Sequence, residues 1–129
     1  MGDRCYLRVE VLAKDAKQMA EILGEERVPE LLAGEKLITF EIDEANYGCS
    51  RELEEAADAR LTFRTANGAG GDYGHGAMVC IEGEAEEIQT TPEGDAFARI
   101  DDGVPRAEDL ASVARFRALD ARFEALIRG

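Results

Sequence analysis

The segment from Cys5 to Leu12, with the sequence CYLRVEVL, shows the alternation that decides the fold. Its apolar residues occupy every second position: Cys5, Leu7, Val9 and Val11. A period of two places these residues on one side of a β-strand and the intervening residues on the other. We therefore predict a half-buried strand, which needs a sheet and a covering layer of helix around it.

The rest of the chain mixes further strands with helices. β-branched and aromatic runs predict strands, and apolar residues at three- or four-residue steps predict helices. The predicted strands are 36–43, 61–65, 77–81, 85–90 and 96–100, and the predicted helices are 15–23, 50–57 and a long one from Pro105, with a helical turn at 28–33. Because strands and helices do not alternate strictly, we predict an α+β fold. Its four- to five-stranded, largely antiparallel sheet is covered on one face by two to three helices.

Two predictions concern the C-terminal third. The segments 85–90 and 96–100 form a final hairpin around the turn Thr91-Pro-Glu-Gly94, because Pro and Gly suit turn geometry. The long helix buries one face, which carries its apolar residues: Leu110, Val113, Phe116, Leu119, Phe123, Leu126 and Ile127.

Size and composition predict a single cytoplasmic domain spanning residues 1–129. The chain has 129 residues, and no apolar run approaches the roughly 18 to 20 residues that span a bilayer. The N-terminus lacks the basic and apolar segments of an export signal. Its three cysteines are an odd number without close spacing, which favours free thiols in a reducing compartment.

The net charge is −13, from 15 basic and 28 acidic residues. The segment from Pro105 onward carries five arginines against four acids, so the first 104 residues hold a charge of −14. Such a surface repels nucleic acid and anionic membranes and attracts basic proteins. We expect a basic protein as the partner, and neither direct nucleic-acid binding nor membrane binding.

The glycine-rich stretch from Asn67 to Gly76 suggests a phosphate-binding loop, but its spacing does not fit one. Read from Gly68, the G-x-G-x-x-G pattern places Tyr73 at the third glycine, and no Gly-Lys-Ser/Thr follows. A shaped connection that needs positive φ is the favoured interpretation. A ligand loop is the alternative, and its residues would be Gly70, Gly71, Asp72, Tyr73 and His75.

We predict no catalytic residue, metal or cofactor. His75, the only histidine, has no identifiable nucleophile beside it. Cys49 precedes a predicted helix, whose dipole could lower its thiol pKa, although an inert cysteine is the favoured interpretation. Together with Cys5 and Cys80, these two residues match the ligand count of a zinc site, but they lack its C-x2-4-C spacing.

The most suggestive charged feature is the alternation of Glu82, Glu84 and Glu86. On one strand such residues lie about 6.6 to 6.8 Å apart on one face, close to the spacing of phosphates along a nucleic-acid strand. We predict a partner-binding surface from this row, its acidic neighbours and two aromatic anchors: Glu82, Glu84, Glu86, Glu87, Glu93, Asp95, Tyr47 and Tyr73. The alternative is a solvated acidic edge that resists aggregation.

At Ala45-Asn-Tyr47-Gly48 and at Gly70-Gly-Asp-Tyr73-Gly74, followed by the strand 77–81, the chain resembles small acidic proteins of bacterial phages and mobile elements. That group supplies no catalytic residue. The resemblance implies an inhibitor of host defence, of the kind that includes anti-CRISPR proteins.

The sequence therefore favours a non-enzymatic inhibitor that blocks a basic surface of a bacterial nucleic-acid-handling complex. Two alternatives remain open. One is a small-molecule or nucleotide-binding domain that uses the loop 67–76. The other is an immunity protein against a basic toxin nuclease, which would use the same acidic surface.

Overall fold

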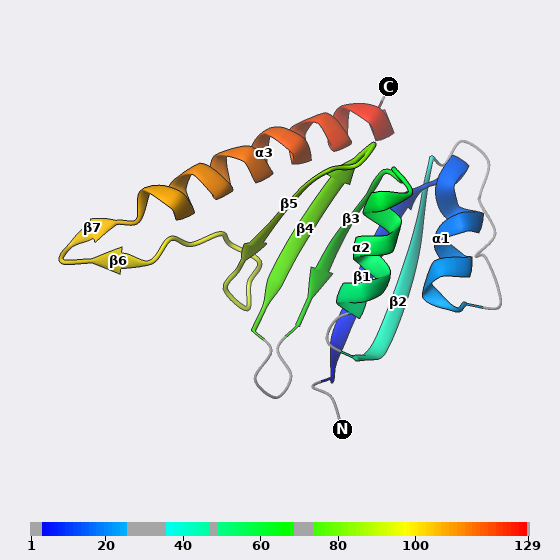
Figure 1. Cartoon of the computed structure of the whole chain (residues 1–129), viewed down its shortest axis with the longest axis horizontal. Helices are drawn as coiled ribbons and strands as arrows, with labels where there is room; N and C mark the ends of the chain where they lie inside the picture. The colour runs from blue at the N-terminus through cyan, green and yellow to red at the C-terminus, as the bar shows by residue number, and fades with distance from the viewer. Residues whose placement is uncertain (1–3, 26–35, 47–48, 69–73, 129) are drawn as a thin grey trace.

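The computed structural model describes residues 4–25, 36–46, 49–68 and 74–128, and its fold is α+β, as predicted (Figure 1). Five antiparallel strands form a sheet in the order β2-β1-β3-β4-β5. These strands are β1 (Arg4–Leu12), β2 (Leu37–Asn46), β3 (Phe63–Asn67), β4 (Gly76–Ile81) and β5 (Glu84–Gln89). The helices are α1 (Ala16–Leu23), α2 (Ser50–Asp58) and α3 (Ala107–Arg128), and a small hairpin pairs β6 (Ile100–Asp101) with β7 (Val104–Pro105). None of the helices in the described segments is both long and apolar enough to cross a bilayer.

The main core lies between α1 and α2 and one face of the sheet. The alternation in β1 is confirmed, because Leu7, Val9 and Val11 are each at most 1% exposed. Both helices place apolar residues against this face, with Met19 from α1 and Leu53 from α2 in the same cluster. The predicted helices 15–23 and 50–57 therefore match α1 and α2 closely, and a short 3₁₀ turn at Ala13–Asp15 leads into α1.

Helix α3 covers the opposite face of the sheet, over β4 and β5 (Figure 1). Its buried residues Leu119 and Phe123 pack against Val79 and Ile81 of β4. The prediction of helices on one face was wrong, because β4 is apolar on both sides. The prediction that Leu110 and Leu126 belong to the buried helix face was also wrong, since they are 51% and 45% exposed.

Arg64 of β3 connects α3 to the sheet. Its guanidinium donates hydrogen bonds to Glu10 at 2.9 Å, to Asp120 at 3.0 Å and to Glu124. It also stacks over the ring of Phe123, 4.7 Å from the ring centroid. One cation therefore binds carboxylates of both the sheet and α3 and fixes where α3 crosses the sheet.

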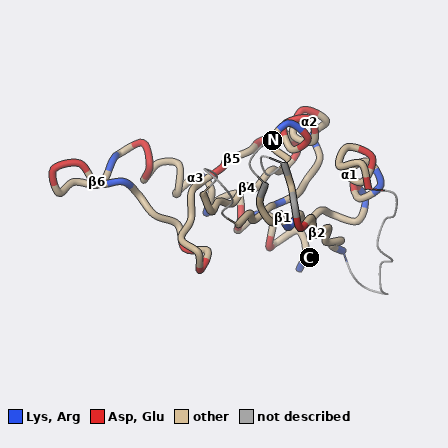
Figure 2. The backbone as a smooth tube through the Cα atoms, turned by 90° about the horizontal axis from the view of Figure 1, so that it is seen from below, with Lys and Arg blue, Asp and Glu red and all other residues tan. Residues whose placement is uncertain are grey.

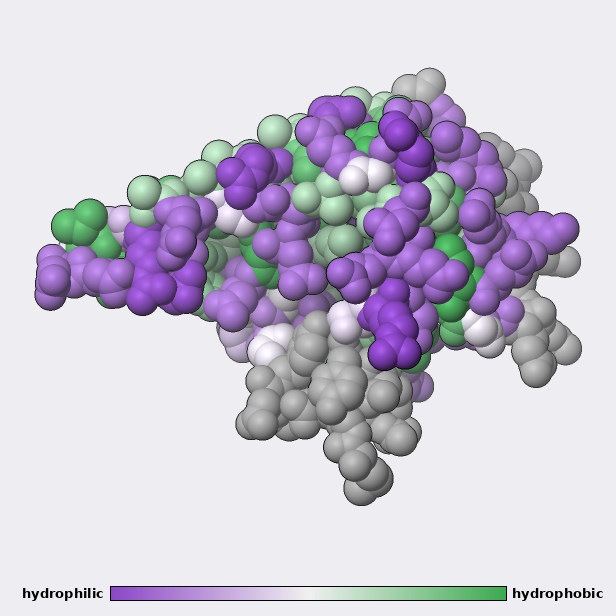
Figure 3. Space-filling view, viewed as in Figure 1, coloured by the Kyte–Doolittle hydropathy of each residue, from purple (hydrophilic) through white to green (hydrophobic). Residues whose placement is uncertain are grey.

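The predicted final hairpin is wrong beyond its turn. The turn itself forms, with Gly94 at φ 90°, and a single bridge joins Thr90 to Ala96. The chain then leaves the sheet, and β6 pairs with β7 instead of β5. We call residues 97–106 the arm. Figures 1 and 2 show it projecting from the body, and Figure 3 shows apolar atoms at its tip.

Other boundaries differ less. The predicted strand 61–65 is displaced to Phe63–Asn67, because the amide of Leu61 donates to the carbonyl of Ala56 and closes the end of α2. Pro105 lies in β7, so the last helix begins at Ala107. The predicted helical turn at 28–33 lies outside the described residues.

Candidate functional site

The acidic row predicted at 82–86 does not form. Glu82 lies in the turn between β4 and β5 with φ 49°, a left-handed conformation, and β5 begins only at Glu84. Its backbone amide donates to the hydroxyl of Thr62 at 3.3 Å, which holds the turn. Because the strand breaks here, Glu82 does not continue the alternation of the two glutamates that follow.

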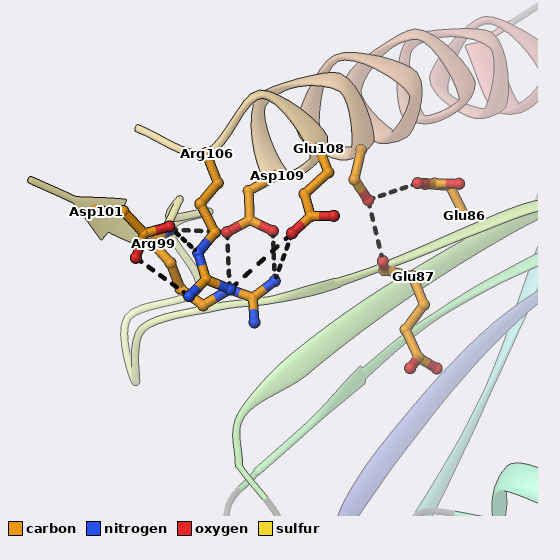
Figure 4. Close-up of polar contacts among 8 residues, drawn as sticks. Glu86, Glu87, Arg99, Asp101, Arg106, Glu108 and Asp109 are labelled. Carbon is orange, nitrogen blue, oxygen red and sulfur yellow. Dashed lines mark hydrogen bonds and ion pairs between the residues drawn. The ribbon is translucent and has the colours of Figure 1, made fainter. Parts of the chain in front are cut away.

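Those two glutamates face α3, where arginines neutralise them. Glu86 accepts a hydrogen bond from Ser112 (Figure 4). It accepts a second from Arg115 at 2.9 Å, and its side chain is only 16% exposed. Burial opposes its charge, but these hydrogen bonds outweigh that cost and lower the pKa of Glu86. Glu84 pairs with Arg122 at 2.8 Å. The geometric premise of an unpaired row of carboxylates was therefore wrong.

The other predicted partner-binding residues are dispersed. Glu93 and Asp95 are exposed in the turn after β5, whereas Glu87 lies on the side of β5 opposite Glu86. Tyr47 and Tyr73 lie outside the described residues, as do the candidate loop residues Gly70, Gly71 and Asp72. The part that these residues play in binding stays a prediction.

A groove crosses the face of the sheet that α1 and α2 cover, and it lies between α2 and β5. It consists of two adjoining cavities of about 300 and 320 Å³, which share Asn67 and Glu87 in their linings. Cavities of this size are at the lower end of the range that holds small ligands or an inserted side chain. His75 lines the second cavity, so the structure brings the only histidine and Glu87 to the same groove.

Acidic groups from two elements meet in the groove. Glu54 of α2 and Glu87 of β5 line the same cavity, and the side-chain carboxylate of neither makes an ion pair or hydrogen bond with another described residue. The cavity also has apolar and neutral polar lining residues: Leu7, Ser50, Leu53, Thr65, Asn67, Ala77 and Met78. An apolar lining with two carboxylates suits a cationic group on an aliphatic stem.

Asn67 shapes one end of the groove. Its side-chain amide donates to the carbonyls of Gly74 at 2.9 Å and Gly68 at 3.2 Å. This arrangement requires a glycine at position 76, where a Cβ atom would lie 2.9 Å from Oδ1 of Asn67 and 3.2 Å from the carbonyl oxygen of Ile88. We predicted that positive φ explains the glycines. None of the described ones in this stretch, Gly68, Gly74 and Gly76, has a positive φ.

Helix α2 extends the acidic surface beyond the groove. Its four acids, against one arginine, are Glu52, Glu54, Glu55 and Asp58. Figure 2 shows acidic positions along α2 and part of α1. None of these four carboxylates is paired with an arginine or lysine in the described part of the chain. The unpaired negative charge of α2 therefore lies on the face of the sheet that α1 and α2 cover, opposite the arginines of α3.

The thiols show no sign of activation. Cys49 lies at the N-terminal boundary of α2, but burial raises its thiol pKa to about 11, and nearby Glu52 adds to the effect. The proposed lowering by the helix dipole was therefore wrong. Cys5 and Cys80 are buried. Within the described segments, no group of three or more His, Cys, Asp or Glu residues is arranged to hold a metal ion.

No family model, curated protein or solved structure matches this chain. The groove residue that the sequence analysis missed is Glu54. Its signal was present in the run Glu52-Leu-Glu-Glu55, which places acids on the exposed side of a helix around one buried leucine. What the sequence could not show is that Glu87, rather than Glu86, faces that helix.

Proposed function

We propose that the chain is a non-enzymatic binding protein that seats an arginine or lysine side chain of a basic partner in the groove between α2 and β5. The observation that carries this proposal is the pair of unneutralised carboxylates, Glu54 and Glu87, in one cavity. The aliphatic stem of the inserted residue would lie against Leu53 and Met78 while its charged group meets the carboxylates. Charge-assisted hydrogen bonds of this kind are about twice as strong as neutral ones.

The overall charge supports a basic partner that handles nucleic acid. A net charge of −13 accelerates encounter with a positively charged surface, and nucleic-acid-binding proteins concentrate lysine and arginine on one face. Occupation of that face would exclude nucleic acid. We therefore propose that the chain acts as an inhibitor of a nucleic-acid-handling complex, in line with the phage-protein resemblance noted above.

A capture experiment with charge-matched variants tests the groove. The full chain is immobilised and exposed to a nuclease-treated bacterial lysate, and retained proteins are identified by mass spectrometry. We expect wild-type protein to retain nucleic-acid-binding proteins. The double variant Glu54→Lys, Glu87→Lys should retain at least about tenfold less of them.

The control is the double variant Glu55→Lys, Glu93→Lys, which makes the same change in net charge at exposed positions outside the groove lining. It should retain most of the binding. Equal losses in both variants would show that charge alone, without the groove, holds the partner. Reversal of Glu84 and Glu86 is unsuitable here, because it disrupts the contacts of α3.

The groove also supports a second candidate, a small-molecule site beside His75. Its volume permits a small ligand, and its two carboxylates favour a cationic molecule over a nucleotide, whose phosphates they would repel. A thermal-shift screen tests this candidate. A metabolite that raises the melting temperature of wild-type protein, but not of His75→Ala, would favour it over a protein partner.

A further inference from the structure

The groove contains a third acceptor besides its two carboxylates, the side-chain oxygen of Asn67. The side-chain nitrogen of this residue donates to two main-chain carbonyls, at 2.9 Å to Gly74 and at 3.2 Å to Gly68. Because a carbonyl oxygen can only accept, these two bonds fix which end of the amide is the oxygen. Within the described part of the chain, no group donates to Oδ1 of Asn67. This oxygen is therefore held in one orientation and is available to a ligand.

Strand pairing places the Asn67 oxygen where the two cavities of the groove meet. Asn67 of β3 pairs with Gly76 of β4, and Oδ1 lies only 2.9 Å from the place of a Cβ atom at position 76. Asn67 and Glu87 line both cavities. Figure 4 shows the Glu87 carboxylate pointing away from α3, toward the side of the sheet that holds the groove.

The three acceptors come from three different elements. Glu54 of α2, Asn67 of β3 and Glu87 of β5 line the same cavity of about 300 Å³. In the sheet order, β4 separates β3 from β5, which puts these two strands about 9 to 10 Å apart. The groove therefore offers its acceptors at separated points and not around a single point.

Separated acceptors distinguish the two basic side chains. A guanidinium is planar and spreads five N–H donors over three nitrogens, whereas an ammonium carries three donors on one strongly hydrated nitrogen. One nitrogen serves only acceptors that lie within about 3 Å of it. The wider group can therefore serve acceptors on three elements at once, and the ammonium cannot.

The chain itself shows a guanidinium used in this way. Arg64 donates from Nε to Glu10 of β1 at 2.9 Å and from Nη1 to Asp120 of α3 at 3.0 Å, while it stacks over the ring of Phe123. Different nitrogens of one group thus bind acceptors of a strand and of a helix. The groove has the same combination of a helix carboxylate, a strand carboxylate and apolar side chains. Among the described residues that line its two cavities there is no arginine or lysine.

We propose that the groove is selective for a guanidinium, so that the partner side chain it binds is arginine and not lysine, and that Asn67 sets this preference. The inference rests on the proposed function, because it names the side chain that the groove accepts. Glu54 and Glu87 attract any cation, whereas Oδ1 of Asn67 accepts an N–H that only the wider group can direct to it at the same time. One such hydrogen bond corresponds to about a fivefold difference in Kd.

Methionine methyl NMR of the full chain tests this preference with two small probes. The protein is titrated with n-butylguanidinium and, separately, with n-pentylammonium, which carry the charged groups of arginine and lysine on aliphatic stems. Met78 lines the groove, whereas Met19 is 0% exposed in the core and serves as the internal control. We expect both probes to move the Met78 signal but not the Met19 signal. The Kd of n-butylguanidinium should be at least about fivefold lower.

The outcomes separate this inference from the proposed function. If both probes move Met78 with equal Kd and Glu54→Gln, Glu87→Gln abolishes the response, the guanidinium preference is overturned but a cationic groove remains. If neither probe moves Met78, both the preference and the cationic groove are overturned. The charge-matched variant Glu55→Gln, Glu93→Gln, outside the groove lining, should bind both probes as wild type does.

Gly76→Ala tests the part played by Asn67. A Cβ atom at position 76 would displace Oδ1, so the Kd of n-butylguanidinium should rise to that of n-pentylammonium, whose own Kd should not change. Gly74→Ala, whose Cβ atom meets nothing within 4 Å, is the control and should keep the preference. An unchanged Met19 signal shows that the core of each variant is folded. A preference that survives in Gly76→Ala would show that Asn67 does not set it.

Discussion

At the scale of single residues, Gly76 and Asn67 depend on each other. The absence of a Cβ atom at position 76 leaves room for the Asn67 amide, which in turn binds Gly74 and Gly68. We predict that Gly76→Ala lowers the free energy of unfolding by about 1 to 2 kcal/mol, because the Asn67 hydrogen bonds are lost. Urea unfolding measures this change.

Gly74→Ala is the matched control for that substitution. A Cβ atom at position 74 meets no atom within 4 Å, and Gly74 does not have a positive φ. Its unfolding free energy should change by less than about 0.5 kcal/mol. If both variants lose the same stability, the close approach of Asn67 is not what selects glycine at position 76.

Arg64 is the second residue whose removal should have a large effect. Its side chain is 19% exposed and pairs with Glu10, Asp120 and Glu124. Its loss leaves Asp120 without an ion-pair partner among the described residues, and leaves Glu10 and Glu124 only their longer pairs with Arg8 at 3.5 Å and Arg128 at 4.0 Å. We predict that Arg64→Ala destabilises the fold by about 3 kcal/mol. Arg51→Ala, at an exposed site with no ion pair to a described residue, should cost less than about 0.5 kcal/mol in the same denaturation experiment. Similar values for both would show that the Arg64 contacts do not stabilise the packing of α3.

At the scale of elements, the arm should resist acid. Hydrogen bonds from Arg99 lower the pKa of Asp109 from 3.8 to about 2. A lowered pKa in the folded state means that the ion pair contributes its full stability above about pH 4 and loses it as the pH falls through 2. We predict that the methyl NMR signals of Ile100 and Val104 stay at their neutral-pH positions down to about pH 4 and move only below about pH 3.

The variant Asp109→Asn is the control for this titration. It removes the charge that binds Arg99, so the arm signals should already differ from those of wild type at pH 7. Wild-type arm signals that shift together with the bulk of the carboxylates, between about pH 5 and 4, would contradict the role of Asp109.

The elements that the sequence predicted well are those with local signals. Alternation predicted β1, and helical periodicity with nearby acids predicted α2, because each pattern reports a single buried face. The arm was missed because residues 96–100 have strand-like composition, but Arg99 is held by Asp109, ten residues further along the chain. The course of α3 was missed for a similar reason: Val79 and Ile81 give the sheet a second apolar face that periodicity alone cannot assign to a partner.

For the candidate site too, the sequence predicted the kind of charge but not which residues meet in space. The sequence predicted acidic charge as the main feature, and that charge is present on α2 and in the groove. It could not show that the arginines of α3 lie over β5, where Arg115 and Arg122 neutralise two glutamates of the predicted row. Nor could it show that Glu54 and Glu87, 33 residues apart, line one cavity.

At the scale of the whole molecule, charge is sorted between the two faces of the sheet. Helix α3 is net neutral and pairs Arg115 and Arg122 with acids of β5, whereas α2 and the groove keep their carboxylates unpaired. The acidic face would meet the proposed basic partner.

A competition titration tests the central claim most directly. A captured basic protein is loaded with a fluorescent oligonucleotide, and the chain is added at low and at moderate salt. We predict that wild-type protein displaces the oligonucleotide, that salt weakens the displacement, and that Glu54→Lys, Glu87→Lys needs at least about a tenfold higher concentration than Glu55→Lys, Glu93→Lys. Simultaneous binding of the oligonucleotide and the chain, or equal displacement by the two double variants, would contradict an acidic groove that occupies a nucleic-acid-binding surface.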